Sequence, residues 1–421
     1  MSYLKPKVKN VFSLLKNNKK IIENYFFMTI LQVLNSFFYL LIYPYLIRTL
    51  GAEGYGLFIF ASSIATYFVF LINFGFDLPA TKSIAENLDN HEKIEDTLSS
   101  IFTTKIYLFI ISTIIFSILL FVIPMFRLHL VLFFLCFLTI ISFIIFPQWY
   151  FQGIQQMRIV TYIQIGFKLV SLPLIFLMVK NPEDLNLYAL IVSLSSLFGG
   201  LVAYIIIVYK NKVRLRFVSF QQIKPWLKEG FPFFLSNFAG IIKEQSITII
   251  IGAFFGMRDV AIYDLANKLI LIPRTLFMSI NGAIFPKLIN NITNEKVKKI
   301  LKVESILSLS VILAITFFGK FIIQIMGGDK MLDAYPIAIL LSVTVVTWLV
   351  IGAYISFVFI PKNKYFLVTK NQLIALLSFI IYMIIGLTLF KSILVFGAAI
   401  ALSGITEIIY CIYVTKRNKL L

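Results

Sequence analysis

The feature that most limits the fold of this chain is a series of apolar runs, each about 20 residues long and separated by short polar segments. A helix needs about 20 apolar residues to cross the ~30 Å hydrocarbon core of a bilayer, so each run is long enough to span it. With 60% hydrophobic and only 14% charged residues, the chain is also too apolar for an ordinary water-soluble globule. The sequence therefore predicts an all-α, polytopic membrane protein.

The apolar runs predict about twelve membrane-spanning helices in two six-helix lobes around a central cavity. The predicted spans are residues 24–46, 56–76, 104–123, 129–147, 160–179, 187–209, 232–255, 260–284, 303–325, 336–358, 372–390 and 393–414. The gaps near Arg258 and Lys391 are short, so the even count depends on dividing the runs there. The longest polar link predicts an N-terminal lobe at 1–209, a cytoplasmic linker at 210–230 and a C-terminal lobe at 231–421.

Most of the 38 lysines and arginines, Lys105 among them, are assigned to alternate loops between the predicted spans. These loops lie on the same side of the membrane as both termini. Positive residues gather in cytoplasmic loops, so both termini are predicted to be cytoplasmic. The lysine-rich arm at 1–20 lacks the apolar core of a signal peptide, so we expect no cleaved leader. Contact with anionic membrane lipids accounts for the net charge of +19, and nucleic-acid binding is not expected.

A weak internal repeat supports two six-helix halves. LGAEGYGLFIFASSI, from Leu50, aligns with FGMRDVAIYDLANKL, from Phe255, and sets Gly51 against Gly256. Each copy would follow the first span of its half. An even number of spans in each copy makes the two copies parallel and relates them by an axis along the membrane normal.

Four segments, in the expected order along essentially the whole chain, carry a resemblance: PYLIRTLGAEGYGLF, INFGFDLPATKSIA, FPQWYFQGIQQM and IIGAFFGMRDVAIYDLANKL. They are similar to the Wzx-type polysaccharide flippases of the multidrug/oligosaccharidyl-lipid/polysaccharide exporter superfamily. The resemblance implies a flippase in the bacterial cytoplasmic membrane, and we expect a monomeric protein that is not an enzyme. Its cargo would be undecaprenyl-pyrophosphate-linked oligosaccharide, moved by alternating access for O-antigen or capsule synthesis, with a polysaccharide polymerase and a chain-length regulator as protein partners.

Charged residues inside the predicted spans are the candidates for the transport site, because charges in a bilayer are costly and usually face a water-filled cavity or a partner. The predicted cargo-binding residues are Lys168, Lys243, Lys268, Arg274 and Arg48, and the candidates for coupling to a proton or cation are Glu244, Asp264 and Glu407. An excess of buried bases would suit a diphosphate.

Several of these residues have a plainer interpretation. Asp264 and Lys268 stand four residues apart on one helix and could neutralise each other. Lys243 could pair with an acid of another helix. Glu244 and Glu407 could also form ion pairs instead of binding a coupling ion.

Three bases lie where helix geometry leaves their role open. Arg274 follows Pro273 in the middle of a span, where a kink can open a cavity, and we favour a cargo-facing role. Lys168 could face the cavity or extend to the membrane surface. Arg48, at the outer rim, is interpreted as a headgroup anchor more than as a cargo ligand.

Two other signals are interpreted structurally, and no catalytic residue, cofactor or metal is expected. Gly51, Gly54 and Gly56 predict a tight turn, because no Lys-Ser/Thr follows to make a phosphate loop. Residues 149–151, Trp-Tyr-Phe, predict an aromatic belt at the membrane surface.

Two other functions remain open: a cation-coupled multidrug exporter of the same superfamily and a membrane-embedded glycosyltransferase or polymerase. An enzyme of that kind would be expected to present a sizeable external loop with paired acids or arginines. The longest predicted outer segment, 320–335, holds only Asp329 and Asp333 as acids. A multidrug exporter commonly carries cations and would need little buried positive charge, so four buried bases against three acids favour an anionic cargo.

Overall fold

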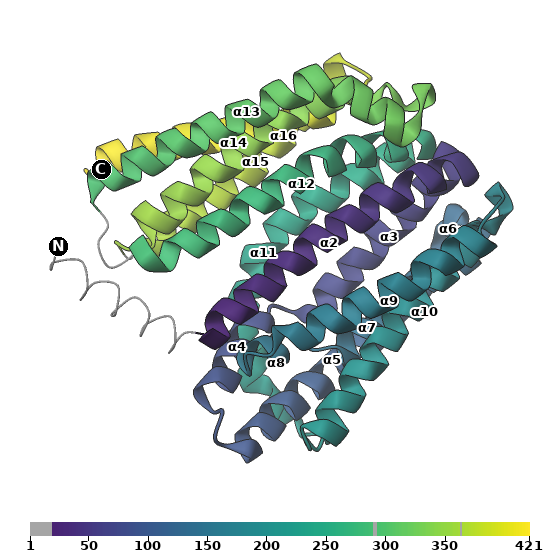
Figure 1. Cartoon of the computed structure of the whole chain (residues 1–421), viewed down its shortest axis with the longest axis vertical. Coiled ribbons are helices and arrows are strands. Elements are labelled where there is room, and N and C mark those ends of the chain that lie inside the picture. Colours follow the sequence, from purple (N-terminus) through teal and green to yellow (C-terminus); the bar gives the residue numbers. More distant parts are fainter. Residues whose placement is uncertain (1–18, 289–292, 363) are drawn as a thin grey trace, which may run out of the picture.

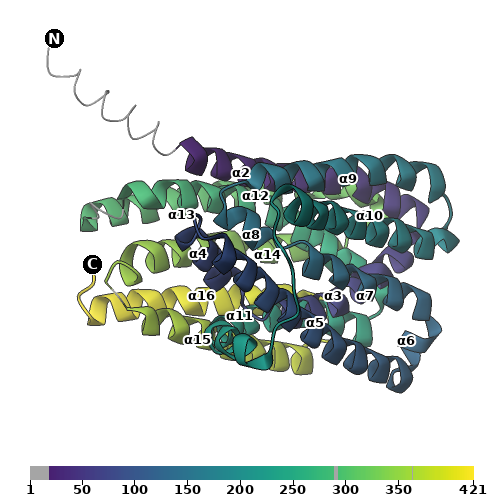
Figure 2. The same ribbon diagram turned by 90° about the horizontal axis from the view of Figure 1, so that it is seen from below.

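The computed structural model describes residues 19–288, 293–362 and 364–421. These residues are almost entirely helical and contain no strand in the described ranges (Figure 1). Most of the lysine-rich arm predicted at 1–20 lies outside them. Figure 2 shows that the long helices run in roughly one direction, as helices that cross one membrane must. The predicted all-α class is confirmed.

The helices up to residue 205 form what we call the N-terminal half. Its elements are α2 (Lys19–Thr49), α3 (Gly51–Asn73), α4 (Asp77–Glu86), α5 (His91–Val122), α6 (Pro124–Leu128), α7 (Leu130–Ile145), α8 (Gln148–Gly153), α9 (Met157–Met178), the 3-10 turn η1 (Pro182–Asp184) and α10 (Leu185–Ile205), which is extended by the π-helical turn η2 (Ile206–Lys210).

The helices from residue 257 onward form what we call the C-terminal half, and α11 (Phe220–Phe254) joins the two halves. The elements of the C-terminal half are α12 (Met257–Leu288), α13 (Asn294–Gly327), η4 (Asp329–Met331), α14 (Ala334–Tyr354), extended by the π-helical turn η5 (Ile355–Phe359), α15 (Tyr365–Leu389) and α16 (Leu394–Arg417). In Figure 1 the two halves lie together where α2 ends and diverge toward the end that holds α4; Gly51 directly follows α2.

Every predicted span falls on one of these helices, and ten candidate membrane helices in the described part of the chain are long and apolar enough to cross a membrane. The two predicted spans outside that group lie on α11 and α12. Lys243 and Glu244 lower the hydropathy of α11, and Asp264, Lys268 and Arg274 lower that of α12. The chain is an integral membrane protein, and the count of twelve spans stays a prediction.

Helix α11 begins at Phe220, inside the segment predicted as a linker at 210–230. The charged residues Lys224 and Lys228 suggest a loop, but they lie on the exposed face of a helix whose Ile223 is buried. Helix α11 then contacts α3 and α5 of one half and α12 and α15 of the other. The division into lobes at 209 and 231 therefore stays a prediction.

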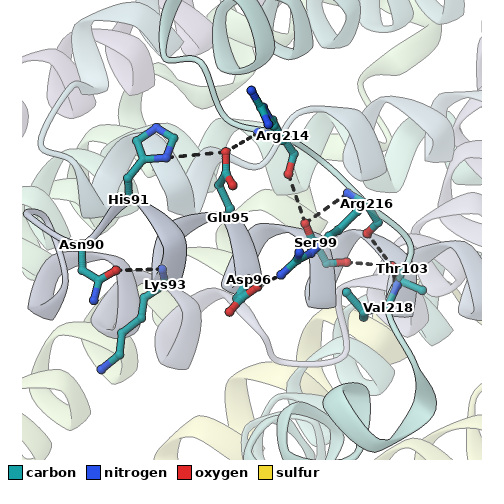
Figure 3. A network of polar contacts seen from close by, with 10 residues as sticks. All are labelled: Asn90, His91, Lys93, Glu95, Asp96, Ser99, Thr103, Arg214, Arg216 and Val218. Carbon is teal, nitrogen blue, oxygen red and sulfur yellow. Dashed lines mark hydrogen bonds and ion pairs between the residues drawn. The ribbon is translucent and has the colours of Figure 1, made fainter.

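The segment before α11 lies along α5 (Figure 3). Three of its backbone N–H groups donate to α5 side chains: Arg214 N to Glu95 Oε1 (2.7 Å), Arg216 N to Ser99 Oγ (3.2 Å) and Val218 N to Thr103 Oγ1 (3.3 Å). The donors alternate along an extended chain, and the acceptors recur every four residues on one helix face. We call residues 213–218 the strap.

The two glycines that the repeat aligns occupy corresponding turns, at the ends of α2 and α11. Gly51 has φ +73° and Gly256 has φ +116°, a backbone region that residues with a Cβ rarely adopt. Gly54 and Gly56 lie inside α3 instead, so the predicted turn is confirmed only for Gly51. A Cβ on Gly56 would stand 1.8 Å from the carbonyl oxygen of Met257, so glycine lets α3 and α12 meet backbone to backbone.

The aromatic belt predicted at 149–151 is wrong. Trp149, Tyr150 and Phe151 are buried, with 4%, 3% and 0% of their surface exposed, and the short helix α8 that carries them packs under α4. Gly153 permits this contact, because a Cβ there would stand 2.7 Å from Ile84 Cγ2. An aromatic ring suits both a membrane surface and a protein core, so sequence alone could not separate the two.

Candidate functional site

A cavity of about 530 Å³ lies inside the N-terminal half, between α2, α3, α7, α9 and α10. Among the described lining residues, Lys268 of α12 comes from the other half. The volume is within the range of pockets that bury a small-molecule ligand. The sequence predicts a central cavity between two lobes. The pocket in the structure is instead lined mainly by residues of the N-terminal half.

The cavity wall combines aromatic rings with neutral polar groups. Its amides and hydroxyls include Asn35, Gln148, Gln164, Ser195 and Ser196. The charged residues among the described lining are both lysines, Lys168 and Lys268, and that lining includes no aspartate or glutamate. The site is therefore electropositive and rich in hydrogen-bonding groups.

Lys168 enters the cavity from α9. Its Nζ donates a hydrogen bond to Asn35 Oδ1 of α2 and lies 5.5 Å from the centroid of the Phe38 ring. The sequence left two positions open for the Lys168 side chain, the cavity and the membrane surface. In the structure it lies at the cavity. The ion pairs of the described residues do not include this lysine.

Lys268 and Asp264 lie one turn apart on α12 but do not form an ion pair with each other. Lys268 Nζ lies 5.3 Å from the centroid of the Tyr39 ring, at the cavity wall. Asp264 is buried, and its Oδ2 accepts hydrogen bonds from Tyr55 (2.9 Å) and Tyr39 (3.4 Å). The acid is thus hydrogen-bonded to tyrosines of the N-terminal half, and the two α12 residues do not form a direct ion pair.

Lys243 and Glu407 form a pair away from the cavity. Lys243 Nζ of α11 lies 3.4 Å from Glu407 Oε1 of α16, and Asn371 Nδ2 of α15 donates to the other oxygen of Glu407 at 3.0 Å. Both charges are largely shielded from solvent. This geometry matches the plainer interpretation, in which Lys243 pairs with an acid of another helix, and the pair links α11 to α16.

Arg274 and Glu244 form the second pair of this region. Arg274 Nη2 lies 3.4 Å from Glu244 Oε1, and the guanidinium carbon lies 4.1 Å from the centroid of the Trp348 ring. Arg274 directly follows Pro273, where a helix kink could open a cavity. Its positive charge, however, is already paired with the Glu244 carboxylate and the face of the Trp348 ring. It does not line the cavity described above.

Arg48 connects the two halves at the Gly51 end. Its Nη2 donates to the carbonyl oxygen of Ile325 at 3.1 Å, near the C-terminal end of α13. The last carbonyls of a helix lack partners within the helix and attract positive charge. The structure therefore gives Arg48 a helix-capping contact.

Two groups of functional interest were missed by reasoning from sequence. Lys105, assigned to a cytoplasmic loop, is buried in α5 and donates to Asn73 Oδ1 (2.8 Å) and to the Phe143 carbonyl (3.0 Å). The apolar run that begins just before Lys105 was the available signal. Tyr39 and Tyr55, which hold Asp264, gave no signal, because an aromatic hydroxyl in an apolar run is compatible with many positions.

The described residues contain no group of three His, Cys, Asp or Glu side chains that could hold a metal ion. Cys136 and Cys411 are buried thiols without a disulfide. What the site offers is binding chemistry: two ammonium groups, several neutral hydrogen-bonding groups and aromatic faces.

Comparison with known proteins extends these observations. The profile of a family described as "Polysaccharide biosynthesis protein" matches residues 21–292. The "Putative O-antigen transporter" of Escherichia coli (strain K12) is 28% identical over 292 residues, which cover 69% of this chain and 70% of that protein. A protein with the same description from Shigella dysenteriae is 26% identical over 255 residues, which cover 60% of this chain and 64% of that protein.

Solved structures with the same arrangement of helices belong to membrane transporters. "Lipid II flippase MurJ, inward closed conformation" superposes with a TM-score of 0.68 and 15% identity, covering 93% of this chain and 86% of that one. An inward-facing multidrug resistance transporter of the MATE family, in the MOP superfamily, gives a TM-score of 0.65 and 14% identity, covering 93% and 99%. At these identities the likeness concerns the fold alone.

Proposed function

This chain belongs to the polysaccharide biosynthesis protein family, and from that premise we propose that it is a flippase for lipid-linked oligosaccharides. Its cargo is undecaprenyl-pyrophosphate-linked oligosaccharide, moved across the bacterial cytoplasmic membrane for O-antigen or capsule synthesis. Two relatives described as O-antigen transporters and a lipid II flippase of similar fold support this proposal. The protein acts as a transporter with cytoplasmic termini, and a polymerase and a chain-length regulator act on its product.

The observation that carries the proposal is the charge of the cavity. Lys168 and Lys268 face it from different halves, neither belongs to a described ion pair, and the described lining has no carboxylate. A pyrophosphate would meet two ammonium groups there, in an environment where charge–charge attraction is stronger than in water. The neutral amides and hydroxyls suit the hydroxyl groups of a glycan.

The alternative of a cation-coupled multidrug exporter receives less support from this site. An organic cation in the cavity would face two positive charges without a compensating acid in the described lining. A glycosyltransferase or polymerase active at this site would need a general acid or base, and the described lining offers no carboxylate for that role.

The position of Lys268 also suggests how binding would be linked to alternating access. Lys168 belongs to α9 of the N-terminal half, and Lys268 belongs to α12 of the C-terminal half. A diphosphate that contacts both would hold the halves together, and their separation would release it. We leave Lys243, Arg274 and Arg48 outside this pair because each already has a protein partner.

The proposal is tested by Lys168→Gln and Lys268→Gln in cells that lack their own transporter of this kind. Each variant is expected to reduce surface polysaccharide by about tenfold or more, because a hydrogen bond to a charged group is lost. Lys320→Gln, an exposed lysine of α13 outside the cavity, is the matched control. Normal polysaccharide from both cavity variants, at control levels of membrane protein, would overturn the proposal.

A multidrug exporter would give a different result in the same strains. Sensitivity to cationic drugs should not depend on this chain if its cargo is a lipid-linked glycan. Loss of drug resistance in the Lys268→Gln strain, with normal polysaccharide, would instead support the alternative.

A further inference from the structure

Lys268 remains free to face the cavity although an acid lies one turn away on the same helix. Asp264 and Lys268 have the i, i+4 spacing at which opposite charges on a helix commonly pair. Attraction between them would be strong in a partly buried site. The described ion pairs nevertheless include neither residue, although the two charges are close enough to attract each other. The contacts around both residues indicate what holds them apart.

Tyr39 of α2 contacts both charges. Its hydroxyl donates to Asp264 Oδ2 at 3.4 Å, and the face of its ring lies 5.3 Å from Lys268 Nζ. A cation at this distance from an aromatic face is attracted to it. One phenol therefore satisfies the acid with its hydroxyl and the base with its ring.

Two further tyrosines keep this arrangement in place. Tyr55 of α3 donates to the same Asp264 oxygen at 2.9 Å. The ring of Tyr43 lies 5.2 Å from that of Tyr39 and 5.1 Å from that of Tyr55, between centroids. Tyr39 is thus packed against Tyr43 in the cavity wall, which all three tyrosines line, and the Asp264 carboxylate is directed toward α2 and α3.

We propose that Tyr39 is a positioning residue that prevents Asp264 from neutralising Lys268 and so keeps the Lys268 ammonium group available to an anionic group in the cavity. This inference rests on the proposed function, because it assumes that Lys268 binds the diphosphate of the cargo. It adds a residue from α2 to the binding site and assigns to Asp264 a contact between the two halves.

The test compares variants of the full-length protein, purified in detergent, for binding of inorganic pyrophosphate by titration calorimetry. Tyr39→Phe retains the ring and should bind within about twofold of the unmodified protein. Tyr39→Leu removes both ring and hydroxyl, so Asp264 can pair with Lys268 and binding should weaken about tenfold. The double variant Tyr39→Leu/Asp264→Asn has no carboxylate to pair with Lys268, so its binding should recover.

Recovery in the double variant separates positioning from a structural role, because a damaged fold would not be repaired by a second substitution in the core. Unchanged binding by Tyr39→Leu, or a double variant as weak as the single one, would overturn the inference. If Tyr39→Leu does not fold, Tyr39→Met makes the same test, because it also removes the ring and the hydroxyl but fills more of the space. Binding should weaken in Tyr39→Met and recover in Tyr39→Met/Asp264→Asn, and unchanged binding by Tyr39→Met would overturn the inference.

Lys268→Gln distinguishes this inference from the proposed function. If the unmodified protein and Lys268→Gln bind pyrophosphate equally well, the anion site itself is refuted. If Lys268→Gln loses binding but Tyr39→Leu does not, only the role of Tyr39 is refuted.

Discussion

Two regions of the protein treat buried charge in opposite ways. Around α11, where it contacts α12 and α16, Lys243 and Arg274 each lie 3.4 Å from a glutamate. At the cavity of the N-terminal half, Lys168 and Lys268 are held by an amide and by aromatic rings, without a carboxylate in the described lining. A base inside a membrane helix is therefore weak evidence for a binding site until its partner is known.

The largest effect is expected where a paired charge loses its partner. Glu407→Gln would leave the buried Lys243 without a counter-charge and should lower the free energy of unfolding by about 3 kcal/mol, measured by denaturant unfolding in detergent. The double variant Lys243→Met/Glu407→Leu should recover most of this loss, because it removes both charges. A stable Glu407→Gln protein would show that the pair does not stabilise the protein.

The contact between the halves should be the next most sensitive feature. Gly56→Ala places a Cβ 1.8 Å from the Met257 carbonyl oxygen, so α3 and α12 must move apart, and the free energy of unfolding should fall by about 2 kcal/mol. The control is Gly54→Ala, whose Cβ would meet only Leu50 Cβ at 3.6 Å. It should be neutral or stabilising by up to about 1 kcal/mol, and equal losses in both variants would contradict the close contact.

The cavity lysines should respond in the opposite direction. Lys268→Met removes a partly buried cation that belongs to no described ion pair, so the free energy of unfolding should rise by about 1 kcal/mol. Surface polysaccharide should fall in the same strain, which is the usual exchange of stability for function at a binding site. A destabilised Lys268→Met protein would show that this lysine, like Lys243, stabilises the fold.

The smallest effect is expected at the strap, which lies along α5 and leads into α11. Ser99 Oγ accepts from Arg216 N at 3.2 Å and donates to the Arg214 carbonyl at 3.4 Å. Ser99→Ala should lower the free energy of unfolding by about 1 kcal/mol and speed proteolysis at residues 213–218. Ser305→Ala, which loses only a bond within α13, is the control, and equal proteolysis in the two variants would argue that Ser99 does not hold the strap.

Parts of the site could be predicted from sequence because they follow from local rules. The charged residues were found as interruptions of apolar runs, and Gly51 and Gly256 were found by their place in the repeat. Two features had no local signal: the position of α8 under α4 and the hydroxyl contacts of Tyr39 and Tyr55. Each depends on a neighbour that comes from a distant part of the chain.

The sequence by itself determined that this protein is a helical membrane protein, because bilayer thickness requires apolar runs of about 20 residues and backbone groups in lipid must be satisfied within each helix. It also determined which helices carry charge. Only the tertiary structure decided which charges are paired. Lys243 meets Glu407 across α11 and α16, whereas Lys268 is kept from Asp264, four residues away, by a tyrosine of α2. Pairing depends on distances between helices, and the order of residues within one helix does not specify those distances.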